Sequence, residues 1–287
     1  MPVDQPVNVY QEQLSSQYLG IALWNPNPVK RLYDCGHISI GDVGYLCDGD
    51  FIRMFNVTLP WNDPSNTKLG KPEEYKTLEQ GHFVNVRDIE LGEVEYFSSH
   101  VSTEESAGNV YATTPEDRGA LLSLPHGGLR TDVIRTKVFE EYVRDNADSW
   151  YTWAQNHKLG VERMEDLILV TGCTLVTSWA AAVFDNHTTP EDATSISLHA
   201  QKFESGGAEF FWRNRHGNID YHNSHFNSLA NDKQYLPRNQ CVFIRVCRAK
   251  YTVFETQHLR AVAEPLPSDP NNRWERTSFQ TNNLRAA

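Results

Sequence analysis

The stretch from Thr131 to Phe184 constrains the fold most, because it joins a long helical pattern to two strongly apolar segments with almost no turn residues between them. Ile134, Val138 and Tyr142 recur at positions i, i+4 and i+8, and charged residues fill much of the opposite face. This spacing is typical of an amphipathic helix packed on a core. The stretch therefore predicts the core of a globular domain.

Both ends of this helix are marked by residues suited to capping. Thr131 can accept a hydrogen bond from a free amide of the first turn, and Gly160 can end the helix just beyond Lys158. The polar segment from Asn146 to Ser149 leaves a second arrangement open, in which two shorter helices replace the long one. The pattern thus predicts helix from Thr131 to about Lys158.

Leu167 to Val170 is a short apolar run, typical of a strand buried on both faces. Thr171-Gly172 follows it, as at the start of a dinucleotide fold, but the positions where that fold needs further glycines carry Val176 and Ser178. We therefore expect a buried strand with a glycine bulge. Ser178 to Phe184 mixes alanines, which favour helix, with aromatic and branched residues, which favour strand, so both remain open.

The clearest hairpin runs from Ile38 to Val57, where Asp48-Gly49-Asp50 separates two aromatic and β-branched runs. Asp42 and Arg53 lie across it from one another and are candidates for a structural ion pair. Further strands are predicted at Ser195 to Ala200, Glu209 to Arg213 and Cys241 to Cys247. The sequence predicts one α+β domain over residues 1–265, mainly antiparallel β-sheet with one long helical segment, and a poorly ordered C-terminal tail over residues 266–287.

Charge and composition exclude several classes of protein. The formal net charge of −11 argues against binding nucleic acid, which requires a concentrated basic face. Met1 to Tyr10 lacks the basic and apolar regions of a secretory signal, and no apolar run approaches the ~20 residues that span a bilayer. The five cysteines show no CxxC spacing. These features predict a cytoplasmic protein without a membrane span.

The densest group of residue types that bind metals lies between Arg213 and His225. Asp220 and His222 share one face of an extended strand, and His225 would fold back toward them across a turn. Neutral imidazole combined with carboxylate suits zinc or iron(II). The spacing matches no known metal motif, so an exposed polar loop between strands is the competing interpretation.

Motifs for covalent catalysis are incomplete. His126-Gly127-Gly128 is similar to the oxyanion loop of some esterases, but the chain contains no G-x-S-x-G nucleophile elbow. Cys173 with the remote His199 is a weak nucleophile and base pair, because apolar surroundings raise the pKa of a thiol. No phosphate-binding P-loop sequence is present either.

The polar stretch from Pro60 to Gly81 is long for a loop inside a compact domain, and such loops often serve a function. Trp61 and Tyr75 within it are candidate ligand-binding residues at a rim or lid. A surface excursion without a function is the alternative interpretation.

Three motifs follow one another along the chain. They are Gly41-Asp42-Val43-Gly44-Tyr45, Leu169-Val170-Thr171-Gly172-Cys173 and Asn239-Gln240-Cys241-Val242-Phe243-Ile244-Arg245. Together they resemble a large, mostly uncharacterised family of intracellular proteins from mushroom-forming (basidiomycete) fungi, over roughly residues 18 to 250. The resemblance implies a soluble fungal protein that serves as a binding or signalling module, and it transfers no catalytic residue.

Many segments predict a buried core and no catalytic motif is complete, which favours a binding protein over an enzyme. The favoured function is an intracellular non-enzymatic binding module for a small-molecule ligand or a protein partner. The alternative is a metal-dependent enzyme built on Asp220, His222 and His225. The sequence alone does not decide whether the chain is an enzyme.

Overall fold

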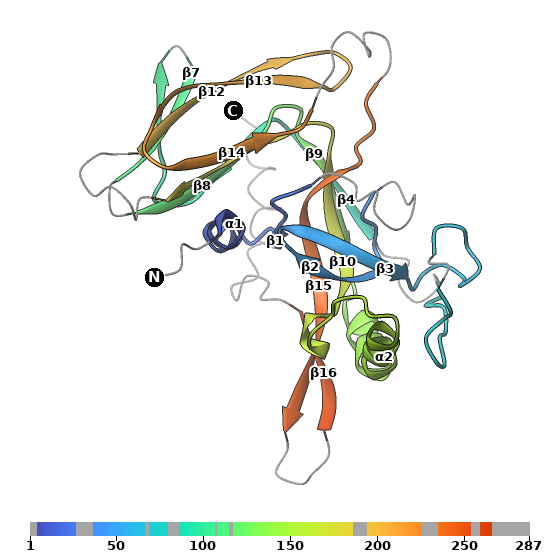
Figure 1. Ribbon diagram of the computed structural model, residues 1–287. Coiled ribbons are helices and arrows are strands. Elements are labelled where there is room, and N and C mark those ends of the chain that lie inside the picture. The colour runs from blue at the N-terminus through green and yellow to red at the C-terminus, as the bar shows by residue number, and fades with distance from the viewer. Residues whose placement is uncertain are drawn as a thin grey trace, which may run out of the picture.

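The computed structural model describes residues 5–26, 37–66, 69–79, 86–106, 108–114, 117–185, 194–225, 235–253 and 259–265. Within these residues the strands form three sheets, and every pairing between two strands is antiparallel. Two α-helices pack against the sheets (Figure 1). The prediction of a mainly antiparallel β-sheet protein is therefore confirmed. The predicted tail, residues 266–287, lies outside the described residues.

An eight-stranded central sheet runs through the middle of the described chain (Figure 1). Its strands are β1 (Ile21–Ala22), β2 (Asp42–Cys47), β3 (Asp50–Asn56), β4 (Val86–Leu91), β9 (Gly128–Val133), β10 (Ile168–Val176), β15 (Gln240–Val253) and β16 (Leu259–Pro265). The predicted hairpin is β2 with β3, and the predicted strand from Cys241 to Cys247 lies within β15. β10 is buried along its whole length, and its register against β15 shifts between Val170 and Gly172, which confirms a buried strand with a bulge.

Two four-stranded sheets pack face to face beside the central sheet. The first sandwich sheet contains β5 (Val94–Phe97), β8 (Arg118–Leu124), β11 (Ala180–Asp185) and β14 (Ile219–Asn223). The second sandwich sheet contains β6 (Ser102–Ser106), β7 (Gly108–Thr113), β12 (Thr194–Lys202) and β13 (Ala208–His216). Leu121 and Phe184 of the first sheet share a buried cluster with Ile196 and Leu198 of the second. The predicted strands around residues 195–200 and 209–213 are thereby confirmed.

β11 decides the question left open for Ser178 to Phe184 in favour of strand. Its alternate residues face two different cores, because Ala182 and Phe184 belong to the sandwich cluster while Ala181 and Val183 pack with the N-terminal helix. A helix would not bury both sets in this alternation, since strand side chains alternate between two faces. Tertiary packing therefore overrides the helix preference of the alanines.

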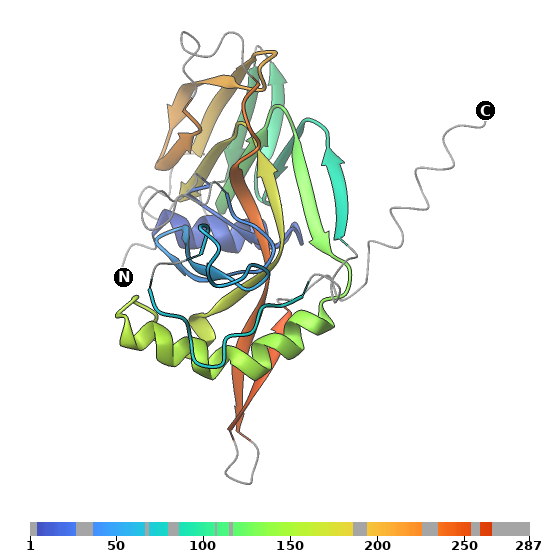
Figure 2. The same cartoon turned by 90° about the vertical axis from the view of Figure 1, so that its right-hand side faces the viewer.

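α2 (Lys137–Asn156) is one continuous helix of 20 residues that lies across the central sheet (Figure 2). Its buried stripe is Phe139, Val143, Ala147, Trp150 and Ala154, one position on from the stripe predicted at Val138 and Tyr142. A short 3-10 helix, η2 (Met164–Asp166), follows before β10. Asn146 to Ser149 does not interrupt α2, so the two-helix alternative is wrong.

The predicted helix start at Thr131 is wrong, because Thr131 lies in β9. There it pairs with Cys173 of β10, and Asp132 beside it accepts from Nε of Arg130 and Nε of Arg245, each at 2.5 Å. These pairings hold residues 128–133 as strand. Ile134, predicted to lie on the buried stripe, is 55% exposed.

α1 (Pro6–Ser15) is a second helix that the sequence analysis did not predict, so a single helical segment is not confirmed. Val9, Tyr10 and Leu14 are buried in a cluster that contains residues of β8, β11 and β15. α1 therefore lies between the first sandwich sheet and the central sheet (Figure 1). Neither helix in the described parts of the chain is both long and apolar enough to cross a membrane.

Candidate functional site

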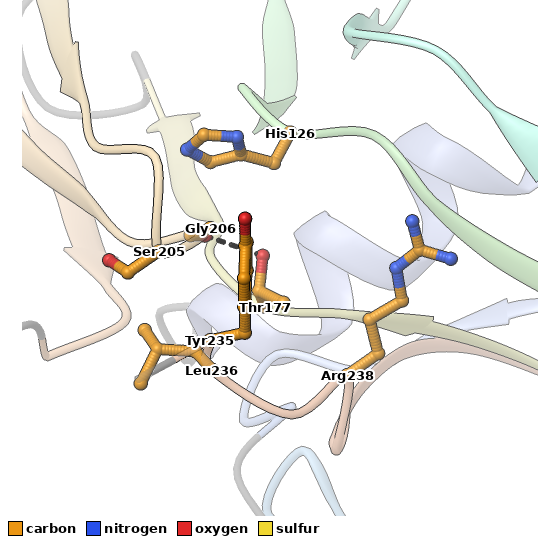
Figure 3. A pocket seen from close by; sticks show the side chains of 7 residues that line it. All are labelled: His126, Thr177, Ser205, Gly206, Tyr235, Leu236 and Arg238. Atoms are coloured by element: carbon orange, nitrogen blue, oxygen red, sulfur yellow. Dashed lines mark hydrogen bonds between the residues drawn. The ribbon is translucent and has the colours of Figure 1, made fainter. Parts of the chain in front are cut away.

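A cavity of about 200 Å³ opens where four segments that are distant in sequence meet. The residues that line it are His126, Thr177, Ser205, Gly206, Tyr235, Leu236 and Arg238. His126 comes from the turn between β8 and β9, Thr177 follows β10, and Ser205 lies in the turn between β12 and β13. Figure 3 shows the labelled residues of these segments arranged around one space. The cavity thus lies at a junction of the central sheet and the sandwich.

The turn that carries His126 is fixed by backbone geometry. Gly127 has a φ of +63°, and a Cβ atom there would lie 1.9 Å from the carbonyl oxygen of Leu91, so only glycine fits. His126 Nε2 lies 2.8 Å from the carbonyl oxygen of Gly207, which links this turn to the β12–β13 turn. The imidazole is therefore held at the cavity wall by a hydrogen bond.

Further hydrogen bonds join the remaining walls. The hydroxyl of Thr177 donates to the carbonyl oxygen of Gly206 at 2.6 Å, and the buried hydroxyl of Ser178 reaches the same oxygen at 3.4 Å. The backbone amide of Leu236 donates to the carbonyl oxygen of Ser205 at 2.8 Å. The other three segments thus each form a hydrogen bond with the β12–β13 turn, which ties the walls of the cavity together.

Two large side chains form the rim of the cavity. Tyr235 is 82% exposed, and its hydroxyl points to the side on which His126 lies (Figure 3). Arg238 Nη1 lies 2.8 Å from Oε1 and 2.7 Å from Oε2 of Glu90, so a carboxylate already compensates its charge. The lining thus includes three hydroxyl-bearing residues, which can both donate and accept hydrogen bonds, and its one arginine is already paired with a carboxylate.

The structure does not gather the predicted metal ligands into a site. Asp220 and His222 lie two residues apart on β14, and both Asp220 and His225 are exposed. Across the described parts of the chain, no group of three or more His, Cys, Asp or Glu side chains is arranged to hold a metal ion. Metal binding by these residues remains a prediction without geometric support.

His222 has a structural environment instead. Its ring stacks on Trp24 with centroids 4.0 Å apart and meets the edge of Trp179 at 4.8 Å. Burial lowers the pKa of His222 to about 4, although a backbone hydrogen bond with Trp24 acts in the opposite direction. The imidazole is therefore neutral at pH 7 and forms part of an aromatic cluster.

The predicted nucleophile and base lie in different sheets. Cys173 is in β10 of the central sheet, and burial raises the pKa of its thiol to about 12. His199 is exposed on β12 of the second sandwich sheet, where its ring lies 6.2 Å from that of Phe211. At neutral pH the Cys173 thiol is protonated, so this pair lacks both proximity and an activated sulfur. Cys241 and Cys247 are free and buried, as the apolar runs around them predict.

Trp61 and Tyr75 pack against the core cluster that contains the buried face of α2. The Trp61 ring lies 5.7 Å from Phe55 and 5.0 Å from Tyr75, and the Tyr75 hydroxyl donates to the carbonyl oxygens of Asn56 and Leu59 at 3.0 and 2.8 Å. Both side chains are partly buried, and neither lines the cavity described above. They fasten the long loop to the domain, and their role in ligand binding remains a prediction.

Most of the cavity residues escaped the sequence analysis. Thr177, Ser205 and Tyr235 lie far apart in sequence and form no motif, so no spacing could have identified them. The available signals were two pairs of glycines, Gly127-Gly128 after His126 and Gly206-Gly207, which mark turns where backbones approach closely.

Comparison with known proteins gives no family. No protein-family model matches the chain, and no curated protein matches it. Among solved structures, "Cryo-EM structure of the Gasdermin A3 membrane pore" contains a chain with 10% sequence identity and a TM-score of 0.29 to this one. That match covers 94% of this chain and 96% of the other, but a TM-score this low supports no conclusion about fold or function.

Proposed function

We propose that this chain is a cytoplasmic, non-enzymatic binding module whose polar cavity holds a small, uncharged, hydroxylated molecule. The observation that supports this most is the lining of the cavity, where three residues that carry hydroxyl groups, Thr177, Ser205 and Tyr235, come from three segments around a space of about 200 Å³. Ligand sites are concave and carry a few polar groups that converge on one space. The resemblance to intracellular fungal proteins is compatible with this role and is part of the proposal.

The charges around the cavity favour a neutral ligand over an ionic one. Glu90 engages Arg238 with both carboxylate oxygens, so a ligand carboxylate would have to compete with an existing pair. The exposed ring of Tyr235 adds an apolar surface with a polar tip, which suits a molecule with one apolar face and several hydroxyl groups. A monosaccharide has this chemistry.

The arrangement of the lining residues favours binding over catalysis. Nε2 of His126 is engaged by the carbonyl oxygen of Gly207, which leaves Nδ1 as the other ring nitrogen, and the Thr177 hydroxyl is engaged by the carbonyl oxygen of Gly206. Covalent catalysis needs a nucleophile within hydrogen-bond reach of its base. Among the lining residues no hydrogen bond joins a hydroxyl group to the imidazole, so the geometry offers no such pair.

The test is a ligand-observed NMR screen of the full chain against glucose, mannose and galactose, with glucuronate and glucosamine as charged counterparts. We expect a neutral sugar to bind more tightly than either charged counterpart. Tyr235→Phe should weaken that binding about fivefold, since a lost hydrogen bond costs ~1 kcal/mol. Tyr235→Ala should weaken it further because it also removes the ring.

Tyr18→Phe is the matched control, because Tyr18 is also an exposed tyrosine but does not line the cavity. Native mass spectrometry and elemental analysis of the same sample separate the remaining interpretations. If no sugar binds and the chain has its bare mass, the small-ligand proposal fails and a protein partner becomes the better interpretation. Stoichiometric zinc or iron lost on His222→Ala with retained folding would favour the metal-dependent enzyme instead.

A further inference from the structure

A second cavity, of about 330 Å³, lies between the β2–β3 hairpin and the C-terminal end of α2. Its main lining residues are Tyr45, Ile52, Arg53, Met54, Lys158 and Leu159. It shares no lining residue with the polar cavity described above. The two cavities are therefore separate sites, and this one joins the predicted hairpin to the residues just beyond α2.

The shape of this cavity comes from an irregular hairpin. Val43 pairs with Phe55 but Gly44 pairs with Arg53, so Met54 is the extra residue of a β-bulge. Bulges redirect side chains, and here three consecutive residues of β3 reach one cavity. Gly44 permits the close approach, since a Cβ atom there would lie 2.2 Å from the carbonyl oxygen of Ile52. The Tyr45 hydroxyl donates to the carbonyl oxygen of Leu159 and so ties the hairpin to the end of α2.

The walls of the cavity are apolar. The side chains of Ile52, Met54 and Leu159 and the ring of Tyr45 supply carbon surface. Met54 is buried, while the other three are partly exposed. Apolar surface left open to water favours a ligand that covers it.

Two cationic side chains border this apolar surface. The Arg53 side chain is 10% exposed, and its Nε lies 2.8 Å from Oδ1 of the fully buried Asp42, an ion-pair contact poorly aligned for a hydrogen bond. Lys158 is exposed and makes no ion pair with the described residues. One carboxylate thus faces two cations, which leaves the cavity with a net positive charge.

We propose that this second cavity binds an amphipathic anion, with its apolar chain against Ile52 and Met54 and its anionic head between Lys158 and Arg53. Medium-chain carboxylates have this chemistry. An alcohol of the same length would cover the same apolar surface but would leave the excess cation without a partner. An alkylammonium ion would place like charges together, which is unfavourable in a partly desolvated site.

The probes are octanoate, 1-octanol and octylammonium, titrated into the full chain by calorimetry below their aggregation concentrations. We expect octanoate to bind about tenfold more tightly than 1-octanol, the effect of one charge-assisted hydrogen bond. Octylammonium should bind most weakly of the three. From hexanoate to octanoate the affinity should rise about fourfold for each CH₂ that enters the cavity.

Methionine methyl NMR locates the bound probe, because the chain contains only Met1, Met54 and Met164. Octanoate should shift the methyl resonance of Met54 and leave that of Met164 unchanged, since Met164 is buried outside this cavity. A shift of Met164 with none at Met54 would overturn the site. Glucose should leave the Met54 resonance unchanged, so this result is independent of the polar cavity.

Lys158→Gln is the decisive variant, because Lys158 is exposed and its loss leaves the buried Asp42–Arg53 pair intact. It should weaken octanoate about tenfold while leaving 1-octanol unchanged. Lys137→Gln is the control at the opposite end of α2, about 30 Å away at ~1.5 Å per residue. The proposal would be overturned if octanoate and octylammonium bind with equal affinity or if no probe binds. It would also be overturned if Lys158→Gln and Lys137→Gln weaken octanoate binding equally.

Discussion

The two cavities differ in how their charges are arranged, although each contains an arginine paired with a carboxylate. In the second, apolar cavity Arg53 pairs with Asp42, and the two side chains are 10% and 0% exposed. In the polar cavity Arg238 pairs with Glu90, and the side chains are 39% and 67% exposed. The same pair of chemical groups is therefore part of the core in one place and part of the solvated rim in the other.

Because the two ion pairs differ in burial, we expect them to contribute differently to stability and to ligand binding. A buried ion pair cannot lose one member without leaving an isolated charge in a poorly solvated site, so it belongs to the stability of the hairpin. An exposed pair is screened by water and adds little to stability. Arg238 and Glu90 instead set the net charge that a ligand meets at the rim.

Removing Arg53 should have the largest effect. Arg53→Ala leaves Asp42 buried without its cation, although Ser39 and Asn56 still donate hydrogen bonds to the carboxylate. We expect the free energy of unfolding to fall by ~3–5 kcal/mol, as is usual when one member of a buried pair is removed. Chemical denaturation at pH 7 measures this change. A loss below ~1 kcal/mol would mean that the pair is effectively solvated.

The second prediction concerns the pH dependence that Asp42 contributes. Burial raises the pKa of Asp42 to about 6 even though Arg53 lowers it. The folded state therefore binds more protons than the unfolded state between about pH 4 and pH 6. The contribution of Asp42 to stability is greatest below this window and is lost as the pH rises through it.

Unfolding free energies of the wild type and Asp42→Asn, measured from about pH 4 to pH 7, isolate this contribution. The variant cannot titrate at this position, so the difference in stability between the two proteins should change with pH in that window. A constant difference would show that Asp42 titrates at its ordinary pKa. The Arg238–Glu90 pair provides the exposed comparison when Glu90→Gln is measured in the same way.

His222 should contribute with the opposite sign over an overlapping range. Burial between Trp24 and Trp179 lowers its pKa to about 4, so the folded state binds fewer protons than the unfolded state up to about pH 6.5. The stability that the buried neutral imidazole contributes is fully present above about pH 6.5 and is lost as the pH falls through about 4. His222→Gln should remove this acid sensitivity, whereas His199→Gln, at an exposed position, should not.

Much of the fold could be predicted because its strands carry local signals. The apolar run before Thr171 and the turn at Asp48-Gly49-Asp50 identified β10 and the β2–β3 hairpin, and the pairing of Arg53 with Asp42 followed from that hairpin. The errors arose where distant pairing decides the structure. Thr131 has a good local signal for a helix start, but pairing with β10 and β4 holds it as strand.

The two cavities could not be predicted for the same reason. Each is made by backbone turns and bulges that meet only in the folded chain, as when Lys158 and Met54 line the same cavity. Polar residues that lie close in sequence, such as Asp220 and His222, predicted a site, but in the folded chain the His222 ring stacks on Trp24. Local density of polar residues therefore located neither cavity.

The smallest effect is expected at the exposed pair. Arg238→Ala should lower the free energy of unfolding by less than ~1 kcal/mol, because water already solvates both partners. Raising the salt concentration to ~1 M should remove most of that difference, since the screening length then falls to about 3 Å. Denaturation at low and high salt, with Arg53→Ala alongside, measures both pairs under one set of conditions. If Arg238→Ala lowers the free energy of unfolding as much as Arg53→Ala does, the exposed fraction of an ion pair does not decide its contribution to stability. The polar cavity then depends on Arg238 for its structure as well as its charge.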